Sequence, residues 1–298
     1  MRDPDVRRTW LFGPGAPGTA RAALRDSGAD ALILDLEDFT PAPLRAVARA
    51  DLGPLLASWR AAGCMTCVRI NALDADGPAD LAAAMHAYAD VIAYPMAASA
   101  AQMRDLDAAI EWHERELGRA PGSIEILPVC ETARGVLDVR EIAAGSARVR
   151  AALLGAEDLA ADLGAERSPE AVELDHARRH FVVACRAAGI EPIDAPYTFS
   201  DAEGAARETR YARRLGYRSK AVVRADHAAA INAALTPTAD EVGRASGMAA
   251  AFDAARARGE ERALFDGLWV EVPTYRNALR LIERARRLAA LERGPGTA

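Results

Sequence analysis

The fold of this chain is decided by short apolar runs that end in charged residues, and the clearest is Ala31-Leu32-Ile33-Leu34-Asp35-Leu36-Glu37-Asp38. The residues from Ala31 to Leu36 predict a strand covered by helices on both faces, because such strands read as near-continuous apolar runs. Seven more runs of this kind occur along the chain: Thr9–Phe12, Thr66–Ile70, Val91–Tyr94, Ile124–Cys130, Ala151–Leu154, Glu191–Ala195 and Lys220–Val223.

Helical patterns separate nearly all of these strands. Examples are Thr19–Asp26, Asp80–Ala89, Ala101–Leu117, Gly135–Ala144, Pro169–Ala188 and Ala202–Leu215. Repeated strand–helix units require parallel strands, and eight of them favour a closed (β/α)8 TIM barrel over an open doubly wound sheet. We therefore expect an α/β barrel at residues 1–238 and a C-terminal helical extension at 239–298, with two helices around a linker at Gly267–Pro273. The extension is expected to pack as a lid on the barrel or on a neighbouring subunit.

Composition excludes several classes of protein. The 298 residues carry 37 Lys and Arg against 43 Asp and Glu, a net charge of -6, which argues against a nucleic-acid partner or an anionic membrane surface. No apolar run approaches the roughly 20 residues that span a bilayer, and the first residues lack the apolar stretch of a signal peptide. We expect a cytoplasmic protein. Four cysteines in a chain of this length argue against a disulfide scaffold.

The turn Gly13-Pro14-Gly15-Ala16-Pro17-Gly18 satisfies the G-x-G-x-x-G pattern of a dinucleotide site and follows a strand. Such a site presents backbone N–H groups to a pyrophosphate, and two prolines remove two of those donors. A tight turn is the favoured interpretation. A nicotinamide oxidoreductase remains the alternative, and NAD(P) binding would test it.

Acids gather where the predicted strands end, which is where TIM barrels place their chemistry. Glu37 and Asp38 follow the second strand, Glu131 the fifth and Asp158 the sixth, whereas the third ends in Arg69. Converging carboxylates repel one another unless a cation lies among them. Oxygen ligands without flanking His or Cys indicate Mg²⁺, or else Mn²⁺, with Glu131 and Asp158 as ligands from neighbouring strands. Arg69 can clamp a substrate carboxylate or a developing enolate oxygen.

The order of these motifs resembles the citrate lyase β-subunit and malyl-CoA lyase group of HpcH/HpaI-type aldolases. The resemblance spans nearly the whole chain and rests on these segments: Arg8–Gly15, Ala29–Asp38, Val68–Asn71, Glu131–Gly135, Gly155–Leu159, Asp162–Gly164, Leu215–Lys220 and Ile231–Asn232. It implies a TIM barrel that assembles as a homo-oligomer, a trimer or hexamer. It further implies that Glu131 and Asp158 bind Mg²⁺ and that Arg69 and Glu131 contact the substrate.

The resemblance implies a Mg²⁺-dependent carbon–carbon lyase for a hydroxyacyl-CoA of the citryl-, malyl- or citramalyl-CoA type. Its substrate is then a CoA thioester, a 2-oxo acid or both. The same metal site would also serve an aldolase for free 2-oxo acids or an acyl-CoA thioesterase, and a non-catalytic acyl-CoA-binding homologue is the alternative of another class. In the mechanism that the resemblance implies, Arg69 would stabilise the oxyanion, and Glu271, Glu37 or Asp38 would move the proton.

This chain departs from the family pattern at three places. Met96 follows Pro95 where the family has Lys, Val223–His227 replaces an Ile-His-Pro-x-Gln motif, and Glu271 stands where the family has Asp. Lys220 is the single lysine beside 36 arginines. A lone barrel lysine suggests a Schiff-base nucleophile, but its place at the start of the eighth strand is remote from the mouth. We expect a structural or substrate-proximal amine.

Overall fold

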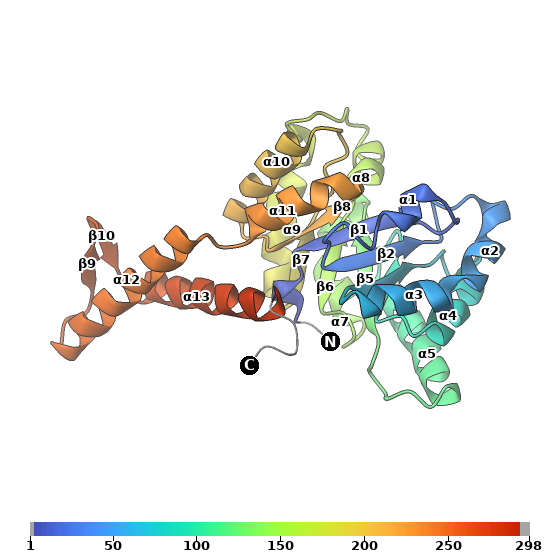
Figure 1. Ribbon diagram of the computed structural model, residues 1–298, viewed down its shortest axis with the longest axis horizontal. Helices are drawn as coiled ribbons and strands as arrows, with labels where there is room; N and C mark the ends of the chain where they lie inside the picture. The colour runs from blue at the N-terminus through green and yellow to red at the C-terminus, as the bar shows by residue number, and fades with distance from the viewer. Residues whose placement is uncertain (1–2, 293–298) are drawn as a thin grey trace. The chain divides into compact units, whose positions relative to one another are not determined.

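The computed structural model describes residues 3–292, and eight parallel strands form a closed barrel in sequence order (Figure 1). The barrel closes where β1 pairs with β8, with Trp10 opposite Ala221. The expected (β/α)8 architecture is confirmed. The strands are β1 (Thr9–Pro14), β2 (Ala31–Asp35), β3 (Met65–Arg69), β4 (Val91–Tyr94), β5 (Glu125–Cys130), β6 (Ala151–Leu154), β7 (Glu191–Asp194) and β8 (Ser219–Val222).

Helices surround the barrel on the outside (Figure 1). They are α1 (Thr19–Ala22), α2 (Arg45–Ala50), α3 (Leu52–Ala61), α4 (Gly77–His86), α5 (Ala100–Glu116), α6 (Ala133–Leu137), α7 (Val139–Ala144), α8 (Glu157–Asp162), α9 (Asp175–Ala187), α10 (Ala202–Leu215) and α11 (Ala228–Leu235). Four short 3₁₀ turns accompany them: η1 (Pro4–Val6), η2 (Ala42–Leu44), η3 (Val172–Leu174) and η4 (Ala225–His227). Local sequence sets several starts. Ser99 and Gln102, for example, form a reciprocal capping box at α5.

Strand side chains alternate between two apolar clusters. On β2 to β8 odd-numbered residues such as Ile33, Cys67 and Val129 fill the barrel interior, whereas on β1 the inward-facing residues are Trp10 and Phe12. Their neighbours along each strand pack outward against the helices in a second cluster. This alternation follows from the two-residue period of a strand. It fixes which residues can reach the mouth of the barrel from the inside.

The helix expected at Asp80–Ala89 is observed three residues earlier, as α4, and three other helices differ more strongly from the sequence-based prediction. The helix expected at Thr19–Asp26 ends at Ala22, and the one expected at Gly135–Ala144 is split at Asp138 into α6 and α7. The helix expected at Pro169–Ala188 begins only at Asp175, after the turn η3. Ala171, just before η3, has a φ of 52°. That left-handed conformation separates the preceding loop from the helix.

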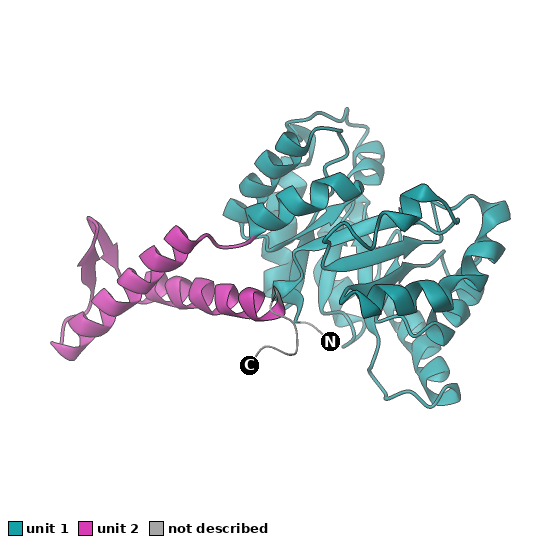
Figure 2. Cartoon of the chain, viewed as in Figure 1, with its two compact units in different colours: residues 1–235 teal, residues 236–298 magenta. Residues whose placement is uncertain are grey.

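The chain divides into two compact units, Met1–Leu235 and Thr236–Ala298 (Figure 2). The second contains α12 (Ala239–Ala257), β9 (Ala263–Phe265), β10 (Leu268–Val270) and α13 (Val272–Glu292). The expectation of a linker at Gly267–Pro273 is wrong, because this region forms a β-hairpin and Pro273 already belongs to α13. Asp266 and Gly267 have φ values of 47° and 74°, as a type I′ turn requires. The packing of this unit on the barrel or on another subunit stays a prediction.

Within residues 3–292, no helix combines the length and the apolar character that crossing a membrane requires.

Candidate active site at the carboxyl ends of the strands

Strand alternation and register bring the expected site residues to one level of the barrel mouth. Asp35 and Arg69 continue the inward-facing series of β2 and β3, and they lie opposite each other in the register of those strands. Glu131 continues the series of β5, and Gly155 continues that of β6, directly beside it. These four positions form the uppermost inward layer of the barrel.

Arg69 is held by carboxylates on three sides. Its Nε donates to Asp35 Oδ1 at 2.9 Å, and its Nη2 donates to the other oxygen of the same carboxylate. Nη1 lies 2.7 Å from Glu37 Oε2, and Nη2 lies 3.9 Å from Asp38 Oδ2. The bidentate contact fixes the plane of the guanidinium. Because Arg69 is 5% exposed, its position is set before a substrate arrives.

Asp35 is a member of the site that the sequence analysis did not select. Besides Arg69, its carboxylate accepts the backbone N–H groups of Glu37 at 2.9 Å and Phe39 at 3.2 Å. It therefore holds both the guanidinium and the loop that carries Glu37 and Asp38. A signal was available, because residues i and i+2 of a strand share a face, which groups Asp35 with Glu37.

Glu131 is buried and is fixed from two sides. Its Oε1 accepts the backbone N–H of Met96 at 2.8 Å. Met96 has a φ of 48°, so a left-handed backbone aims this N–H at the carboxylate. On the other side, a Cβ at Gly155 would lie 2.4 Å from Glu131 Cβ and 3.0 Å from Oε2. Only glycine leaves room for this orientation of Glu131.

The electrostatics of the site favour an added cation. Burial raises the pKa of Glu37 to about 7, opposed by Arg69 and reinforced by Asp38, Asp35 and Asp158. Burial also raises the pKa of Glu131 to about 7, opposed by the Met96 N–H and Arg69 and reinforced by Asp158 and Glu37. Asp158 therefore lies close enough to act on both glutamates. The structure brings Arg69, Glu37, Asp38, Glu131 and Asp158 together.

The donors present fit a magnesium ion. Among residues 3–292, no group of three or more His, Cys, Asp or Glu side chains is close enough to hold a metal. Mg²⁺ commonly takes one or two carboxylates and leaves its other positions to water and substrate oxygens, so the pair Glu131 and Asp158 suffices. Glu37 Oε2 is buried and makes no hydrogen bond, but it is ion-paired with Arg69 Nη1 at 2.7 Å. The excess of carboxylates over Arg69 is therefore what indicates a site for a further cation.

Residues 8–225 match the family model described as HpcH/HpaI aldolase/citrate lyase. The chain belongs to this family. It is 32% identical over 290 residues to the citrate lyase subunit beta of Leuconostoc mesenteroides subsp. cremoris, covering 96% of this chain and 95% of that protein. It is also 32% identical over 306 residues to the L-malyl-CoA/beta-methylmalyl-CoA lyase of Cereibacter sphaeroides, covering 95% and 96%.

Solved structures agree with the family assignment. The protein CitE from Mycobacterium tuberculosis, in complex with magnesium, acetoacetate and coenzyme A, matches 94% of this chain and 98% of its own with a TM-score of 0.72 and 27% identity. The expected family, the TIM barrel and the class of carbon–carbon lyase are thereby confirmed for this chain.

Asp158 lies in the first turn of α8, which follows β6. The backbone N–H of Ala133, at the start of α6, donates to Asp162 Oδ2 at 2.7 Å, and this bond ties α8 to the segment after Glu131. Asp162 thus links the two segments that carry the expected metal ligands, Glu131 and Asp158. The neighbouring Glu157 pairs instead with Arg167 at 3.1 Å.

Glu271 belongs to the second unit of the chain, residues 236–298. Its carboxylate lies 3.8 Å from Arg262 and is more than half exposed. Its role as a proton-transfer group stays a prediction.

Lys220 does not face the barrel interior. Its Nζ donates to Asp194 Oδ2 at 2.6 Å, to the Ala195 carbonyl at 2.5 Å and to Glu208 Oε1 at 2.7 Å. Arg178 donates to the same Asp194 carboxylate at 2.8 and 2.7 Å. Lys220 is an even-numbered residue of β8, so it enters the layer between the strands and helices α9 and α10. This buried cluster gives Lys220 a structural role.

The glycine-rich turn at residues 13–18 is also structural. The backbone N–H of Gly15 donates to the Asp35 carbonyl at 3.1 Å and to Thr40 Oγ1 at 2.8 Å. Because this N–H is used to hold the loop after β2, it does not point at a ligand. The helix that follows has four residues, too few for a pyrophosphate cradle.

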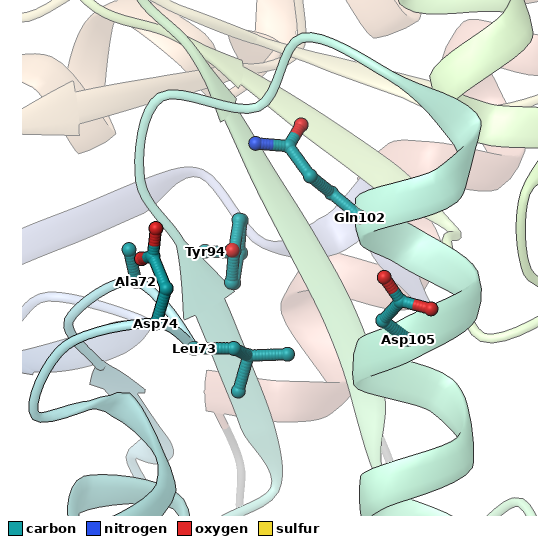
Figure 3. Close-up of a pocket in the computed structure, with 6 residues that line it drawn as sticks. All are labelled: Ala72, Leu73, Asp74, Tyr94, Gln102 and Asp105. Atoms are coloured by element: carbon teal, nitrogen blue, oxygen red, sulfur yellow. The ribbon is translucent and has the colours of Figure 1, made fainter.

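A separate cavity of about 340 Å³ lies beside β4, between the loop after β3 and helix α5 (Figure 3). Asp74 and Asp105 enter it from opposite sides, with Tyr94 between them. None of the expected catalytic or metal-binding residues lines it. Its two carboxylates disfavour an anionic ligand such as a phosphate of coenzyme A.

Proposed function

We propose that this chain catalyses the Mg²⁺-dependent cleavage, or the reverse condensation, of a hydroxyacyl-CoA of the citryl-, malyl- or citramalyl-CoA type. The observation that carries the proposal is the inward layer at the barrel mouth. There a fixed guanidinium, Arg69, acts on a buried carboxylate, Glu131, whose pKa the charge of Asp158 also raises, and we assign Glu131 and Asp158 as the metal ligands. Relatives that are carbon–carbon lyases of citrate and malyl-CoA support it.

When bound, Mg²⁺ supplies a Lewis acid and a template for two oxygens of the 2-oxo acid portion of the substrate. Glu131 and Asp158 would hold it. Arg69 has five N–H donors. The Asp35 carboxylate accepts two of them, and the Glu37 carboxylate is ion-paired with Nη1. The remaining donors of this fixed fork can receive the oxyanion that develops on the substrate.

The proton transfers are assigned to a carboxylate. Cleavage removes the proton of the substrate hydroxyl, breaks the bond between the carbinol carbon and the α-carbon of the thioester, and leaves the electron pair as a thioester enolate. A proton then returns to that α-carbon, which yields an acyl-CoA and a 2-oxo acid. Glu37, whose pKa of about 7 suits exchange near neutrality, is the first candidate, with Asp38 beside it and Glu271 as the candidate from the second unit.

The test is product analysis with purified protein, Mg²⁺ and a panel of hydroxyacyl-CoA esters. Formation of an acyl-CoA together with a 2-oxo acid supports the lyase. Release of free CoA without carbon–carbon cleavage indicates a thioesterase. Cleavage of free 2-oxo acid aldols alone indicates an aldolase, and tight binding without turnover indicates a non-catalytic homologue. Repeating the assay with Mn²⁺ in place of Mg²⁺ tests whether Mn²⁺ also supports turnover.

A variant pair tests the metal site. Glu131→Gln should abolish Mg²⁺-dependent turnover while circular dichroism shows an intact fold. Glu157→Gln, on an exposed acid next to Asp158, is the matched control and should remain active. Full activity of Glu131→Gln would refute the site assignment.

The assembly and the location of the enzyme complete the proposal. We assign it a homo-oligomeric state, a trimer or hexamer, which light scattering measures. The four cysteines Cys64, Cys67, Cys130 and Cys185 are free thiols, which agrees with a reducing compartment such as the cytoplasm.

A further inference from the structure

Two large apolar side chains are exposed beside the charged layer at the barrel mouth. Phe39 follows β2 and is 42% exposed, and Met96 follows β4 and is 47% exposed. Both strands flank β3, which carries Arg69. Covering these side chains with an apolar part of a ligand would be favourable, because it removes apolar surface from water.

Phe39 is held against the guanidinium. Its backbone N–H donates to Asp35 Oδ2 at 3.2 Å, and its ring meets the edge of the Phe12 ring with 6.2 Å between centroids. Arg69 Cζ lies 5.8 Å from the centroid of the Phe39 ring and 5.2 Å from that of Phe12. An anion bound by Arg69 therefore has an aromatic wall beside it.

Met96 is held against the expected metal ligand. Its backbone N–H donates to Glu131 Oε1, so the origin of its side chain is fixed next to that carboxylate. The side chain itself is unbranched and adapts to the shape of an apolar group. The charged residues at the mouth thus have a fixed aromatic ring beside Arg69 and an exposed, unbranched side chain whose backbone is fixed beside Glu131.

The charges at the mouth oppose a second carboxylate on the substrate. The carboxylates of Asp35, Glu37, Asp38, Glu131 and Asp158 outnumber the cationic side chain on which they act, Arg69. One substrate carboxylate would bind the divalent ion, whereas a further one would face these carboxylates.

We infer that Phe39 and Met96 form the walls of the acyl pocket and select a hydroxyacyl-CoA whose carbinol carbon carries a short alkyl group rather than a carboxymethyl group. The inference rests on the proposed function and names its substrate class. Cleavage then releases an alkyl 2-oxo acid such as pyruvate, and citramalyl-CoA is the corresponding ester. Citryl-CoA, which releases oxaloacetate, is the disfavoured ester.

A binding experiment tests the inference without turnover. Isothermal titration calorimetry in the presence of Mg²⁺ compares pyruvate and 2-oxobutyrate with oxaloacetate. We expect the alkyl 2-oxo acids to bind at least about 10-fold more tightly, since one methyl-sized group in an apolar pocket gives about 10- to 200-fold discrimination. Phe39→Ser and Met96→Lys should each reduce this preference, whereas Phe39→Leu should keep it. Tighter binding of oxaloacetate to the unaltered protein overturns the inference.

Turnover separates a failure of the inference from a failure of the proposed function. The ratio of kcat/KM for citramalyl-CoA to that for citryl-CoA should exceed about 10 and should fall about 10-fold in Phe39→Ser. Leu44→Ser, equally exposed but in η2, should leave the ratio unchanged. Equal cleavage of both esters refutes the selectivity and leaves the lyase standing. No cleavage of any ester refutes the lyase, and the 2-oxo acid affinities then decide whether the walls select alkyl groups.

Discussion

Gly155→Ala is the substitution that tests the geometry of the metal site most directly. The new Cβ would lie 2.4 Å from Glu131 Cβ, whereas ordinary contact begins at 3.4 Å, so Glu131 must move by about 1 Å. The contacted atom belongs to the base of the side chain at the end of β5, so rotation of the carboxylate does not relieve the clash. The hydrogen bond from Met96 restrains the same carboxylate from the other side.

The expected effect follows from the demands of the metal. Mg²⁺ requires near-ideal octahedral geometry at about 2.0–2.1 Å. A displacement of about 1 Å in a catalytic group costs about 100-fold in rate, or about 2.7 kcal/mol. We therefore expect Gly155→Ala to lower kcat/KM by about 100-fold and to weaken Mg²⁺ binding.

The assay combines Mg²⁺ titration by calorimetry with kcat/KM at saturating Mg²⁺. Gly53→Ala is the matched control, because a Cβ at this position on α3 meets no heavy atom within 4 Å. It should keep full activity, and it should gain a few tenths of a kcal/mol of stability. Native Mg²⁺ affinity and activity in Gly155→Ala would refute the reasoning that Glu131 must occupy its observed position.

Three further predictions follow from the charged groups. Because burial raises the pKa values of Glu37 and Glu131 to about 7, Mg²⁺ binding should release protons and should weaken below about pH 7. For the same reason the metal-free protein should lose stability as the pH rises from about 4.5 to about 7. Calorimetry in two buffers measures the proton release, thermal unfolding measures the stability, and a Kd for Mg²⁺ that is independent of pH from 6 to 8 contradicts the first prediction. Lys220→Met should lower the free energy of unfolding by about 3 kcal/mol in urea, because it removes a cationic partner of the buried carboxylates Asp194 and Glu208. Borohydride labelling of Lys220 in the presence of substrate would instead show that this lysine is a nucleophile. Asp35→Asn should lower kcat/KM by about 10- to 100-fold, because a charged hydrogen-bonded contact to Arg69 contributes about 1.5–3 kcal/mol, and unchanged kinetics would remove Asp35 from the site.

The barrel was predictable because its strands are short, apolar and separated by helical patterns. Each predicted strand overlaps an observed one, and the eight close in sequence order. The hairpin in the second unit was missed although Asp266-Gly267 is a type I′ signal. Its strands have three residues each, too few to show an alternating pattern. The short α1 likewise has no cap that would mark its end in the sequence.

The site was predictable as far as charge type and strand end allow. These locate Arg69, Glu131 and Asp158 at the mouth, but they do not reveal which backbone groups hold them. The Met96 N–H and the space above Gly155 are properties of the folded chain. The place of Glu271 depends on how the second unit packs, which the sequence of one chain does not determine.

One rule of strand geometry separates the proposed site residues of this barrel from the structural ones. Arg69 and Lys220 are both buried cations on strands, and each contacts two or more carboxylates. Arg69 is in phase with the inward-facing Cys67 and therefore reaches the mouth, whereas Lys220 precedes the inward-facing Ala221 and therefore points to the helices. A shift of one residue along its strand would turn the Arg69 side chain toward the helices and the Lys220 side chain toward the barrel interior. The phase of Lys220 on its strand thus argues against the Schiff-base chemistry that a lone lysine suggests, and the same argument places Asp35 at the candidate active site.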